Sequence, residues 1–382
     1  MRPINLDHNA TTPVDPAVLD AMLPFLREDF GNPSSAHAAG RRAHDAVEAA
    51  RAEVAALIGA QTNEIVFTSG GTEASNIAIR GAATRDPRRR AVVTTTIEHP
   101  ATEACCALLE RDGHPVRRIA PQPDGRVSAQ AVAAAIGDDT ALVTIIHAQN
   151  EIGTLQPLGE IARATHAKGA LMHADAAQSV GKVPVDVAAL GLDLLTIAGH
   201  KLYAPKGIGV LYMRRGLDLP PLIVGAGQEH GRRPGTENVA GIVALGQACR
   251  LARRRLKSGT HQLAALARDL LARLQREVPR LLLVGHPTDR LPNTLNVLFP
   301  GTSGRRVLEA CPGVLASTGS ACHADREDPS AILLALGIGP EAALGAVRLS
   351  LGYATTRDDI ETAAARLGEA WRAVARVPAS AK

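Results

Sequence analysis

The sequence predicts an α/β protein with two domains: a large domain built on a mostly parallel sheet, and a smaller α+β domain at the C-terminal end. Between about residues 60 and 215, short β-rich runs alternate with alanine-rich helical stretches, the pattern of parallel strands joined by crossover helices. Several runs are apolar throughout, as expected of strands that are covered on both faces. After residue 280 the pattern changes to mixed short strands and helices, which indicates the second domain.

Seven β-rich runs are expected to form the large sheet. They are Ile65–Thr68, Ala91–Ile97, Val116–Ile119, Ala141–His147, Ala170–Ala174, Asp193–Ile197 and Gly207–Met213. Helical patterns such as Ala101–Glu110 and Leu158–Ala167 separate several of these runs. The sequence therefore predicts a mostly parallel seven-stranded sheet with helices on its faces.

Residues 237–277 read as helix with few interruptions, and we expect this long helix to be the hinge between the domains. We expect its basic stretch Arg250–Lys257 to be a solvated face, because lone basic faces seldom mark binding sites. In the small domain we expect strands and helices in the following ranges. The strands are Leu281–Val284, Thr294–Phe299, Val314–Ala316 and Val347–Leu351, and the helices lie near Ser330–Leu336 and Arg357–Val374.

The composition excludes several classes of protein. In a chain of 382 residues, 46% apolar and 21% charged residues are ordinary for a folded globular protein. Aromatic residues make up only 2%, which leaves few stacking platforms for single-stranded nucleic acid, and the net charge of +4 favours no direct nucleic-acid partner. Five cysteines are too few for a disulfide framework, and no apolar leader or long apolar run is seen. We therefore expect a cytoplasmic protein with no membrane partner.

A glycine pair follows the first predicted strand of the sheet, in the segment Thr68–Asn76, and a helical pattern opens there. Gly70 and Gly71 let the backbone approach a ligand, the N–H groups of a helix start favour an anion, and Thr72 adds a hydroxyl. The segment is either a phosphate site or an ordinary tight turn. It matches neither the P-loop nor the dinucleotide fingerprint, which disfavours ATP and NAD.

Asp175 stands at the carboxyl end of an apolar strand, where open α/β sheets place their ligands. A carboxylate in this position can hold a ring nitrogen protonated, because a nearby negative charge favours the cationic form. The alternative is that Asp175 only caps the residues that follow it.

Lys201 is the best candidate for a Schiff-base lysine among only six lysines. It lies between two predicted strands, flanked by Gly199 and His200, where a merely solubilising lysine is unusual. Lys182 and Lys206 are less easily dismissed than the remaining three.

Cys322 differs from the other cysteines. It follows five small residues in a predicted loop, and a thiol on an accessible loop can reach a substrate and hand on what it collects. Cys105, Cys106 and Cys249 fall on predicted helices and fit the usual buried, inert thiol, whereas Cys311 stays unassigned. No cysteine and histidine cluster has metal-site spacing, so we expect no metal.

Arg348 lies inside an otherwise apolar strand, where an arginine is costly unless it has a partner. Its planar fork suits the bidentate capture of a carboxylate, and a structural ion pair is the alternative.

Together these motifs resemble the cysteine desulfurases and their relatives, the selenocysteine lyases. The matching motifs occur in order from residue 6 to residue 352 and cover nearly the whole chain. They are LDHNATTP, FGNPSSAH, FTSGGTEASN, IEHP, HAQNEIG, HADAAQSVGK, GHKLYAPKGIG, RRPGTEN, LPNTLNV, STGSACHAD and VRLSLG. The resemblance implies a pyridoxal-phosphate (PLP) enzyme of fold type I in the class V aminotransferase group.

The resemblance also implies roles for individual residues. Lys201 would carry PLP as a Schiff base, His99 would stack on its ring and assist proton transfer, and Cys322 would take the substrate sulfur as a persulfide. Asp175 would pair with the ring nitrogen, and Arg348 would bind the substrate carboxylate. The remaining implied contacts are Gln178 and Asn150 near the ring oxygen, Gly71, Thr72 and His200 at the phosphate, Thr236 reaching the phosphate from a second subunit, and Asn32 and Asn150 at the substrate.

The implied reaction converts L-cysteine to L-alanine and passes sulfur to an acceptor protein such as an iron–sulfur scaffold. The role of Thr236 implies a homodimer with shared sites. With this fold we expect residues 1–15 to pack with the small domain, residues 16–255 to form the large domain, and residues 256–382 to form the small domain with the cysteine loop.

Three residues depart from the family pattern. Ala198 replaces a serine that would offer a phosphate hydroxyl, and Gln149 replaces the asparagine common in this motif. Pro100 follows His99 where desulfurases often carry lysine and animal selenocysteine lyases aspartate. The alternatives that stay open are a selenocysteine lyase, a class V aminotransferase or kynureninase-like enzyme, and a scaffold protein that has lost catalysis.

Overall fold

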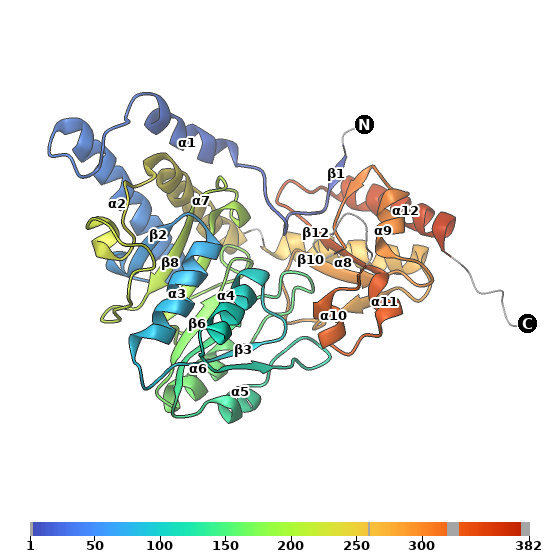
Figure 1. Ribbon diagram of the computed structural model, residues 1–382. Helices are drawn as coiled ribbons and strands as arrows, with labels where there is room; N and C mark the ends of the chain where they lie inside the picture. Colours follow the sequence, from blue (N-terminus) through green and yellow to red (C-terminus); the bar gives the residue numbers. More distant parts are fainter. Residues whose placement is uncertain (1–2, 259, 319–327, 376–382) are drawn as a thin grey trace, which may run out of the picture.

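The computed structural model describes residues 3–258, 260–318 and 328–375 (Figure 1). In Figure 1 the large α/β domain and the smaller domain, drawn in orange and red, lie side by side. Their arrangement confirms the predicted fold class of a mostly parallel seven-stranded sheet with a smaller α+β unit.

The large sheet has the strand order β2-β8-β7-β6-β5-β3-β4. Only β8 runs opposite to its neighbours; the other pairs are parallel. The strands, in this order, are Ile65–Thr68, Gly209–Met213, Leu194–Ala198, Leu171–Asp175, Thr140–Ile146, Ala91–Thr95 and Val116–Ile119. All seven predicted runs are confirmed, with ends that move by up to two residues.

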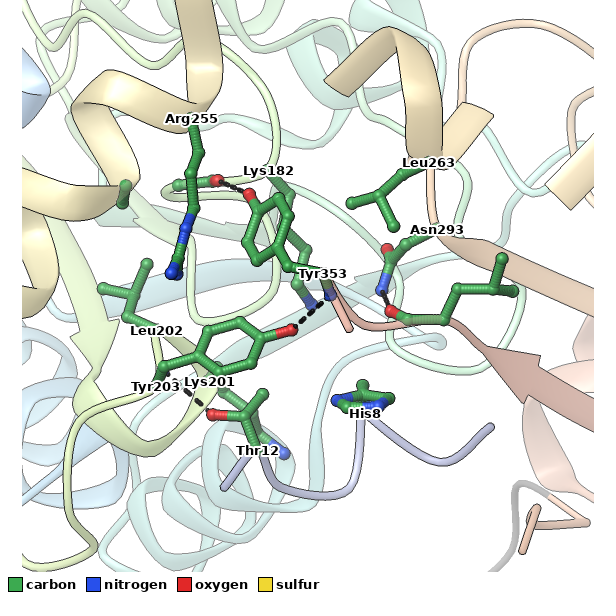
Figure 2. Close-up of a pocket in the computed structure, with 13 residues that line it drawn as sticks. His8, Thr12, Lys182, Lys201, Leu202, Tyr203, Arg255, Leu263, Asn293 and Tyr353 are labelled. Carbon is green, nitrogen blue, oxygen red and sulfur yellow. Dashed lines mark hydrogen bonds between the residues drawn. The ribbon is translucent and has the colours of Figure 1, made fainter. Parts of the chain in front are cut away.

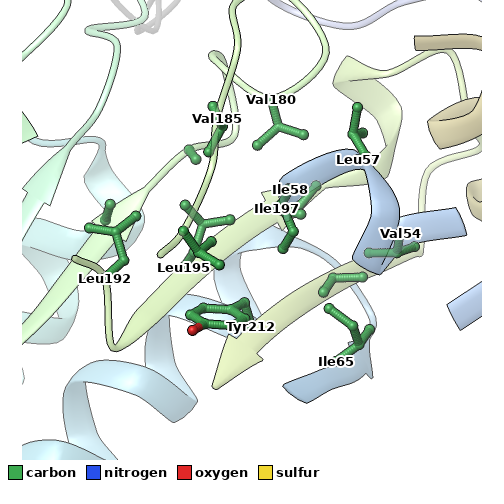
Figure 3. Close-up of a cluster of buried hydrophobic side chains, with 14 of the residues drawn as sticks. Val54, Leu57, Ile58, Ile65, Val180, Val185, Leu192, Leu195, Ile197 and Tyr212 are labelled. Atoms are coloured by element: carbon green, nitrogen blue, oxygen red, sulfur yellow. The ribbon is translucent and has the colours of Figure 1, made fainter. Parts of the chain in front are cut away.

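Both faces of this sheet are covered, which explains why its strands are apolar throughout. On one face, side chains such as Ile65 and Ile197 pack against α2 and α7 in the core shown in Figure 3. On the other face, alternate residues such as Val66 pack against α3 and α4. The helices of this domain are α1 (Pro16–Arg27), α2 (Ala38–Ile58), α3 (Gly71–Arg85), α4 (Pro100–Arg111), α5 (Ala129–Ala135), α6 (Leu158–Ala167) and α7 (Val239–Ser258).

The small domain has its own core around a three-stranded antiparallel sheet of order β12-β10-β9. The N-terminal strand β1 (Ile4–Asn5) joins this domain by pairing with β11 (Val314–Leu315). The other elements are β9 (Leu282–Val284), β10 (Thr294–Leu298), β12 (Ala346–Ser350), α8 (Thr260–Glu277), α9 (Gly304–Glu309), α10 (Ala331–Ala335), α11 (Pro340–Leu344) and α12 (Arg357–Val374). The exact division at residues 255 and 256 stays a prediction.

The helix predicted over residues 237–277 begins at Val239. The structure describes it as α7 up to Ser258 and as α8 from Thr260 to Glu277, on either side of residue 259. Among the described residues, no helix is both long and apolar enough to cross a membrane.

Candidate active site

A cavity of about 370 Å³ opens at the carboxyl ends of the parallel strands β5, β6 and β7. This is the edge at which open α/β sheets bind ligands. The strand ends, the first turns of α3 and α4, the N-terminal segment and β12 of the small domain all contribute to it. The lining residues are Asn9, Ala10, Gly71, Thr72, His99, Ala101, Ile146, Asn150, Asp175, Ala177, Gln178, Ala198, His200, Lys201 and Arg348.

One end of the cavity is the start of α3, where the predicted glycine pair follows β2. Gly70 has φ 154° and ψ −179°, a conformation that favours glycine, and no side chain caps the helix here. A Cβ on Gly71 would lie 3.3 Å from the Cβ of Ala198, so a larger residue at position 71 would crowd the cavity wall. Uncapped N–H groups at a helix start suit an anion.

Asp175 ends β6 in a buried position, with Oδ1 accepting a hydrogen bond from the Ala177 N–H at 2.9 Å. It therefore lines the cavity and also caps the following turn. Desolvation raises the pKa of Asp175, and the nearby His99 and Lys201 oppose this rise.

His99 is the N-cap of α4, and Pro100 takes the first helical position. Its Nδ1 accepts a hydrogen bond from the Ala101 N–H at 3.1 Å, so in the neutral imidazole the proton lies on Nε2. Desolvation lowers the pKa of His99, which favours this neutral form.

Lys201 closes a short 3₁₀ turn, Gly199–Lys201, directly after β7. Its amine donates hydrogen bonds to the backbone carbonyls of Asn9, at 2.5 Å, and Ala10, at 2.6 Å. Desolvation, with Arg348 nearby, lowers the pKa of Lys201 to about 8. The lowered pKa increases the share of the amine that is uncharged and nucleophilic near neutral pH.

Arg348 projects from β12 and is 5% exposed. Its Nη2 forms an ion pair with Asp7 Oδ1 at 2.8 Å, and its Nη1 donates to the Asn150 carbonyl at 3.2 Å. Its Nε has no partner among the described residues. The ion pair with Asp7 shows that Arg348 has the structural role given as the alternative. Other N–H groups of its guanidinium, Nε among them, can still donate to a further acceptor.

Some predicted residues are not brought to the cavity by this chain. Asn32 and Thr236 are exposed and are not among the lining residues. Cys322 lies outside the described residues. Cys105, Cys106 and Cys249 are buried on α4 and α7, as predicted, and Cys311 is also buried.

The three departures from the family pattern have separate structural settings. Ala198 lines the cavity, and Pro100 starts α4. Gln149 instead turns its side chain inward, where Oε1 accepts hydrogen bonds from the N–H groups of Glu151 and Ile152. It also donates to Asn150 Oδ1, so it holds the turn that carries Asn150.

No individual role was predicted for the N-terminal residues Asp7, Asn9 and Ala10. Asp7 holds Arg348, and the carbonyls of Asn9 and Ala10 hold the Lys201 amine. A signal was present, because Asp7, His8 and Asn9 place three polar side chains in succession after the apolar Leu6. Lys182 was noted without a role; it lies next to this segment and donates to Asn9 Oδ1.

Sequence comparison agrees with this geometry. Residues 4–362 match the family described as aminotransferase class-V. The chain belongs to the class-V aminotransferase family. Among curated relatives in this family, a cysteine desulfurase of Trichormus azollae is 43% identical over 94% of this chain and 91% of its own length. The cysteine desulfurase NifS of Azotobacter vinelandii is 42% identical over 94% of this chain and 90% of its own length.

Solved structures agree with the fold. A NifS-like protein superposes with a TM-score of 0.91 at 34% identity, covering 97% of this chain and all of the other. A NifS-like protein from Rickettsia africae gives a TM-score of 0.87 at 30% identity, with coverage of 97% and 100%.

Proposed function

We propose that this chain is a PLP-dependent cysteine desulfurase. It would convert L-cysteine to L-alanine and pass the sulfur, through a persulfide on Cys322, to an acceptor protein such as an iron–sulfur scaffold. The observation that carries the proposal is the convergence of Lys201, Asp175, His99 and Arg348 on one cavity at the carboxyl edge of the sheet. Relatives that are about 43% identical and named cysteine desulfurase support it.

The lining of the cavity fits pyridoxal phosphate. The uncapped start of α3, with Gly71, Thr72 and His200, suits a phosphate; the Asp175 carboxylate suits a protonated ring nitrogen; and the Lys201 amine suits an aldehyde. Gln178 and Asn150 would add polar contacts to the ring oxygen. When bound, the cofactor supplies an electron sink for the bonds around the substrate α-carbon.

Each protein group has a task that its setting supports. Lys201 has a lowered pKa and offers an uncharged amine for covalent attachment. His99 keeps its proton on Nε2 because Nδ1 is occupied by the Ala101 N–H, so Nε2 is the atom that would give up a proton. Asp7 and the Asn150 carbonyl hold the Arg348 guanidinium, whose remaining N–H groups would bind the substrate carboxylate.

The two ends of the segment that carries Cys322 are tied to residues beside the cavity. Before it, Ser317 pairs with the backbone of Arg348. After it, the Ser330 hydroxyl donates to Glu151 Oε2 at 2.6 Å, next to Asn150. In the proposed step the Cys322 thiolate attacks the substrate sulfur; a sulfur–sulfur bond forms and the substrate carbon–sulfur bond breaks. The electron pair stays with the carbon fragment, which takes up a proton to become alanine.

We also propose a homodimer with shared sites. Thr236 and Asn32 are exposed. Phe30, two residues before Asn32, is 83% exposed, and Val224 is 89% exposed. A second chain covering these surfaces would bring Thr236 to the partner's phosphate site. The four described cysteines are free thiols, which is consistent with a cytoplasmic location.

The proposal is tested by following alanine and sulfide release from L-cysteine in the presence of a thiol reductant. Cys322→Ala is expected to abolish sulfide release, whereas Cys311→Ala, a change of a buried thiol in the small-domain core, is the matched control. Full sulfide release by the Cys322→Ala protein would exclude the persulfide route. Comparing kcat/KM for L-cysteine and L-selenocysteine on the same preparation separates the desulfurase from a selenocysteine lyase.

A further inference from the structure

Lys182 is a buried lysine without an acidic partner among the described residues. It lies in the segment after β6 and is 7% exposed. Its amine donates to Oδ1 of Asn9 at 3.1 Å and to Oε1 of Gln178 at 2.7 Å. Burial of an unpaired ammonium is costly, and desolvation lowers the pKa of Lys182 well below its usual value. The amine serves as a hydrogen-bond donor to two amide oxygens.

Lys182 lies behind the active-site cavity and not in its lining. Together with Lys201 it borders a rear chamber of about 10 Å³, around which the side chains of His8, Tyr203 and Tyr353 are gathered (Figure 2). Lys201 borders both spaces, whereas Lys182 borders only the rear chamber. The hydrogen bonds of Lys182 therefore reach the front cavity only through other residues.

The two partners of Lys182 are amide side chains, and its amine helps to decide which end of each amide faces it. Asn293 Nδ2 also donates to Asn9 Oδ1, at 3.3 Å. The two ends of an amide have nearly the same shape, so the surrounding donors and acceptors fix its orientation. Because Lys182 supplies donors, both amides turn their oxygen toward it. The Gln178 Nε2 then donates to the Asn9 carbonyl at 2.9 Å, and the Asn9 Nδ2 donates to the Thr294 hydroxyl at 2.9 Å.

Asn9 transmits this arrangement to the Lys201 amine. Its carbonyl accepts hydrogen bonds from both Gln178 and Lys201, and its backbone N–H donates to the Ser350 hydroxyl at 2.9 Å. Asn9 thus joins the N-terminal segment, the large domain and the small domain at the point where the reactive amine lies. Loss of the Lys182 donor would leave Gln178 Oε1 without a partner among the described residues. It would leave Asn9 Oδ1 with the longer hydrogen bond from Asn293 Nδ2, at 3.3 Å.

We propose that Lys182 is a positioning residue that, through the amides of Gln178 and Asn9, holds the Asn9 and Ala10 carbonyls against the Lys201 amine. The inference deepens the proposed function and rests on it only for the identity of the ligand. Lys182 itself touches neither the substrate nor the cofactor in this account.

The first test measures the dissociation constant of pyridoxal 5′-phosphate for the full chain stripped of cofactor. Lys182→Met keeps the length of the side chain without its donor, and we expect roughly tenfold weaker binding. Lys182→Gln retains an N–H donor and is expected to recover part of the affinity. Lys168→Met, the same change at the exposed end of α6, is the control and is expected to bind like wild type.

The second test needs no cofactor and measures the pH dependence of trace acetylation at Lys201 by mass spectrometry. In Lys182→Met the Asn9 and Ala10 carbonyls stabilise the ammonium less well, so the midpoint is expected to move to lower pH. Asp7, Asp175 and Arg348 also act on the Lys201 charge and are unchanged in this variant.

A midpoint that moves to higher pH would mean that Lys182 acts as a charge, and would overturn the proposal. Unchanged affinity and midpoint with only a lower Tm would show a merely structural role and would also overturn it. A wild-type chain that binds no pyridoxal phosphate would instead contradict the proposed function, while the acetylation midpoints would still decide the role of Lys182.

Discussion

Lys201 separates two regions of very different character. In front of it, a cavity of about 370 Å³ is lined by charged and polar groups, one of which, Arg348 Nε, is buried without a partner among the described residues. Behind it, the rear chamber of about 10 Å³ offers room for at most a single water. The front cavity therefore has room for a ligand, whereas the rear chamber is filled by side chains that pack against one another.

The rear chamber also concentrates aromatic side chains, which are scarce in this protein. Two of the three tyrosines, Tyr203 and Tyr353, lie there with ring centroids 5.4 Å apart, and the Arg255 guanidinium stacks over both. Tyr203 has φ 66°, an uncommon conformation for a residue with a side chain. Its N–H donates to the Thr12 hydroxyl, and its hydroxyl accepts from the Tyr353 N–H. We therefore expect substitutions in the front cavity to change kcat or KM, and substitutions in the rear chamber to change the free energy of unfolding.

The largest expected effect is at the residue that the two regions share. Lys201→Ala removes the amine to which the cofactor would attach, and we expect kcat to fall by roughly 10³-fold or more. Steady-state alanine production with added pyridoxal phosphate measures it. Lys206→Ala, an exposed lysine nearby, serves as the control. Activity within tenfold of wild type would mean that the Lys201 amine is not needed for catalysis.

A front residue that binds substrate should alter KM more than kcat. Arg348→Lys keeps the charge but loses the planar fork, and we expect KM for L-cysteine to rise roughly 10- to 100-fold. Initial rates over a range of L-cysteine concentrations measure this. Arg117→Lys, a change in a partly exposed ion pair on β4, should leave KM unchanged. An unaltered KM in Arg348→Lys would mean that Arg348 serves only its ion pair with Asp7.

The sequence predicted the front better than the rear, for a physical reason. Asp175 and Lys201 follow strands whose order in a parallel sheet brings their ends together, so local pattern was sufficient. Asp7 and Asn9 reach the site because the N-terminal segment runs past it in the folded chain. Their hydrogen-bond partners there lie about 140 to 340 positions away in sequence. No local pattern encodes such a crossing.

The roles of Thr236 and Asn32 depend on a second chain, so the geometry of a single chain leaves them as predictions.

The Lys201 amine should also make cofactor capture depend on pH. Desolvation lowers its pKa to about 8, and the uncharged amine is the reactive form. The rate of pyridoxal phosphate uptake should therefore rise about tenfold per pH unit below 8 and level off above it. Stopped-flow absorbance at several pH values measures this rate. A midpoint near 10.5 would mean that the cavity does not desolvate the amine.

A rear residue should affect stability more than rate. Tyr203→Phe removes the acceptor of the partly buried Tyr353 N–H, which we expect to cost about 1–2 kcal/mol of the free energy of unfolding, with KM unchanged. Urea unfolding measures the cost. Tyr212→Phe changes the remaining tyrosine, whose hydroxyl has no hydrogen bond among the described residues, and should cost less than about 0.5 kcal/mol. Equal losses of unfolding free energy in the two variants would mean that the rear chamber has no special part in stability.

The most direct test of the account is mass spectrometry of the peptide that contains Cys322, after one turnover with L-cysteine and rapid alkylation. The account predicts one added sulfur on Cys322 and none on Cys105, Cys106, Cys249 or Cys311, which are buried. It also predicts no added sulfur in the Lys201→Ala protein. Alanine formed in the single turnover with no sulfur on Cys322 would contradict the central claim that this chain is a desulfurase working through a Cys322 persulfide.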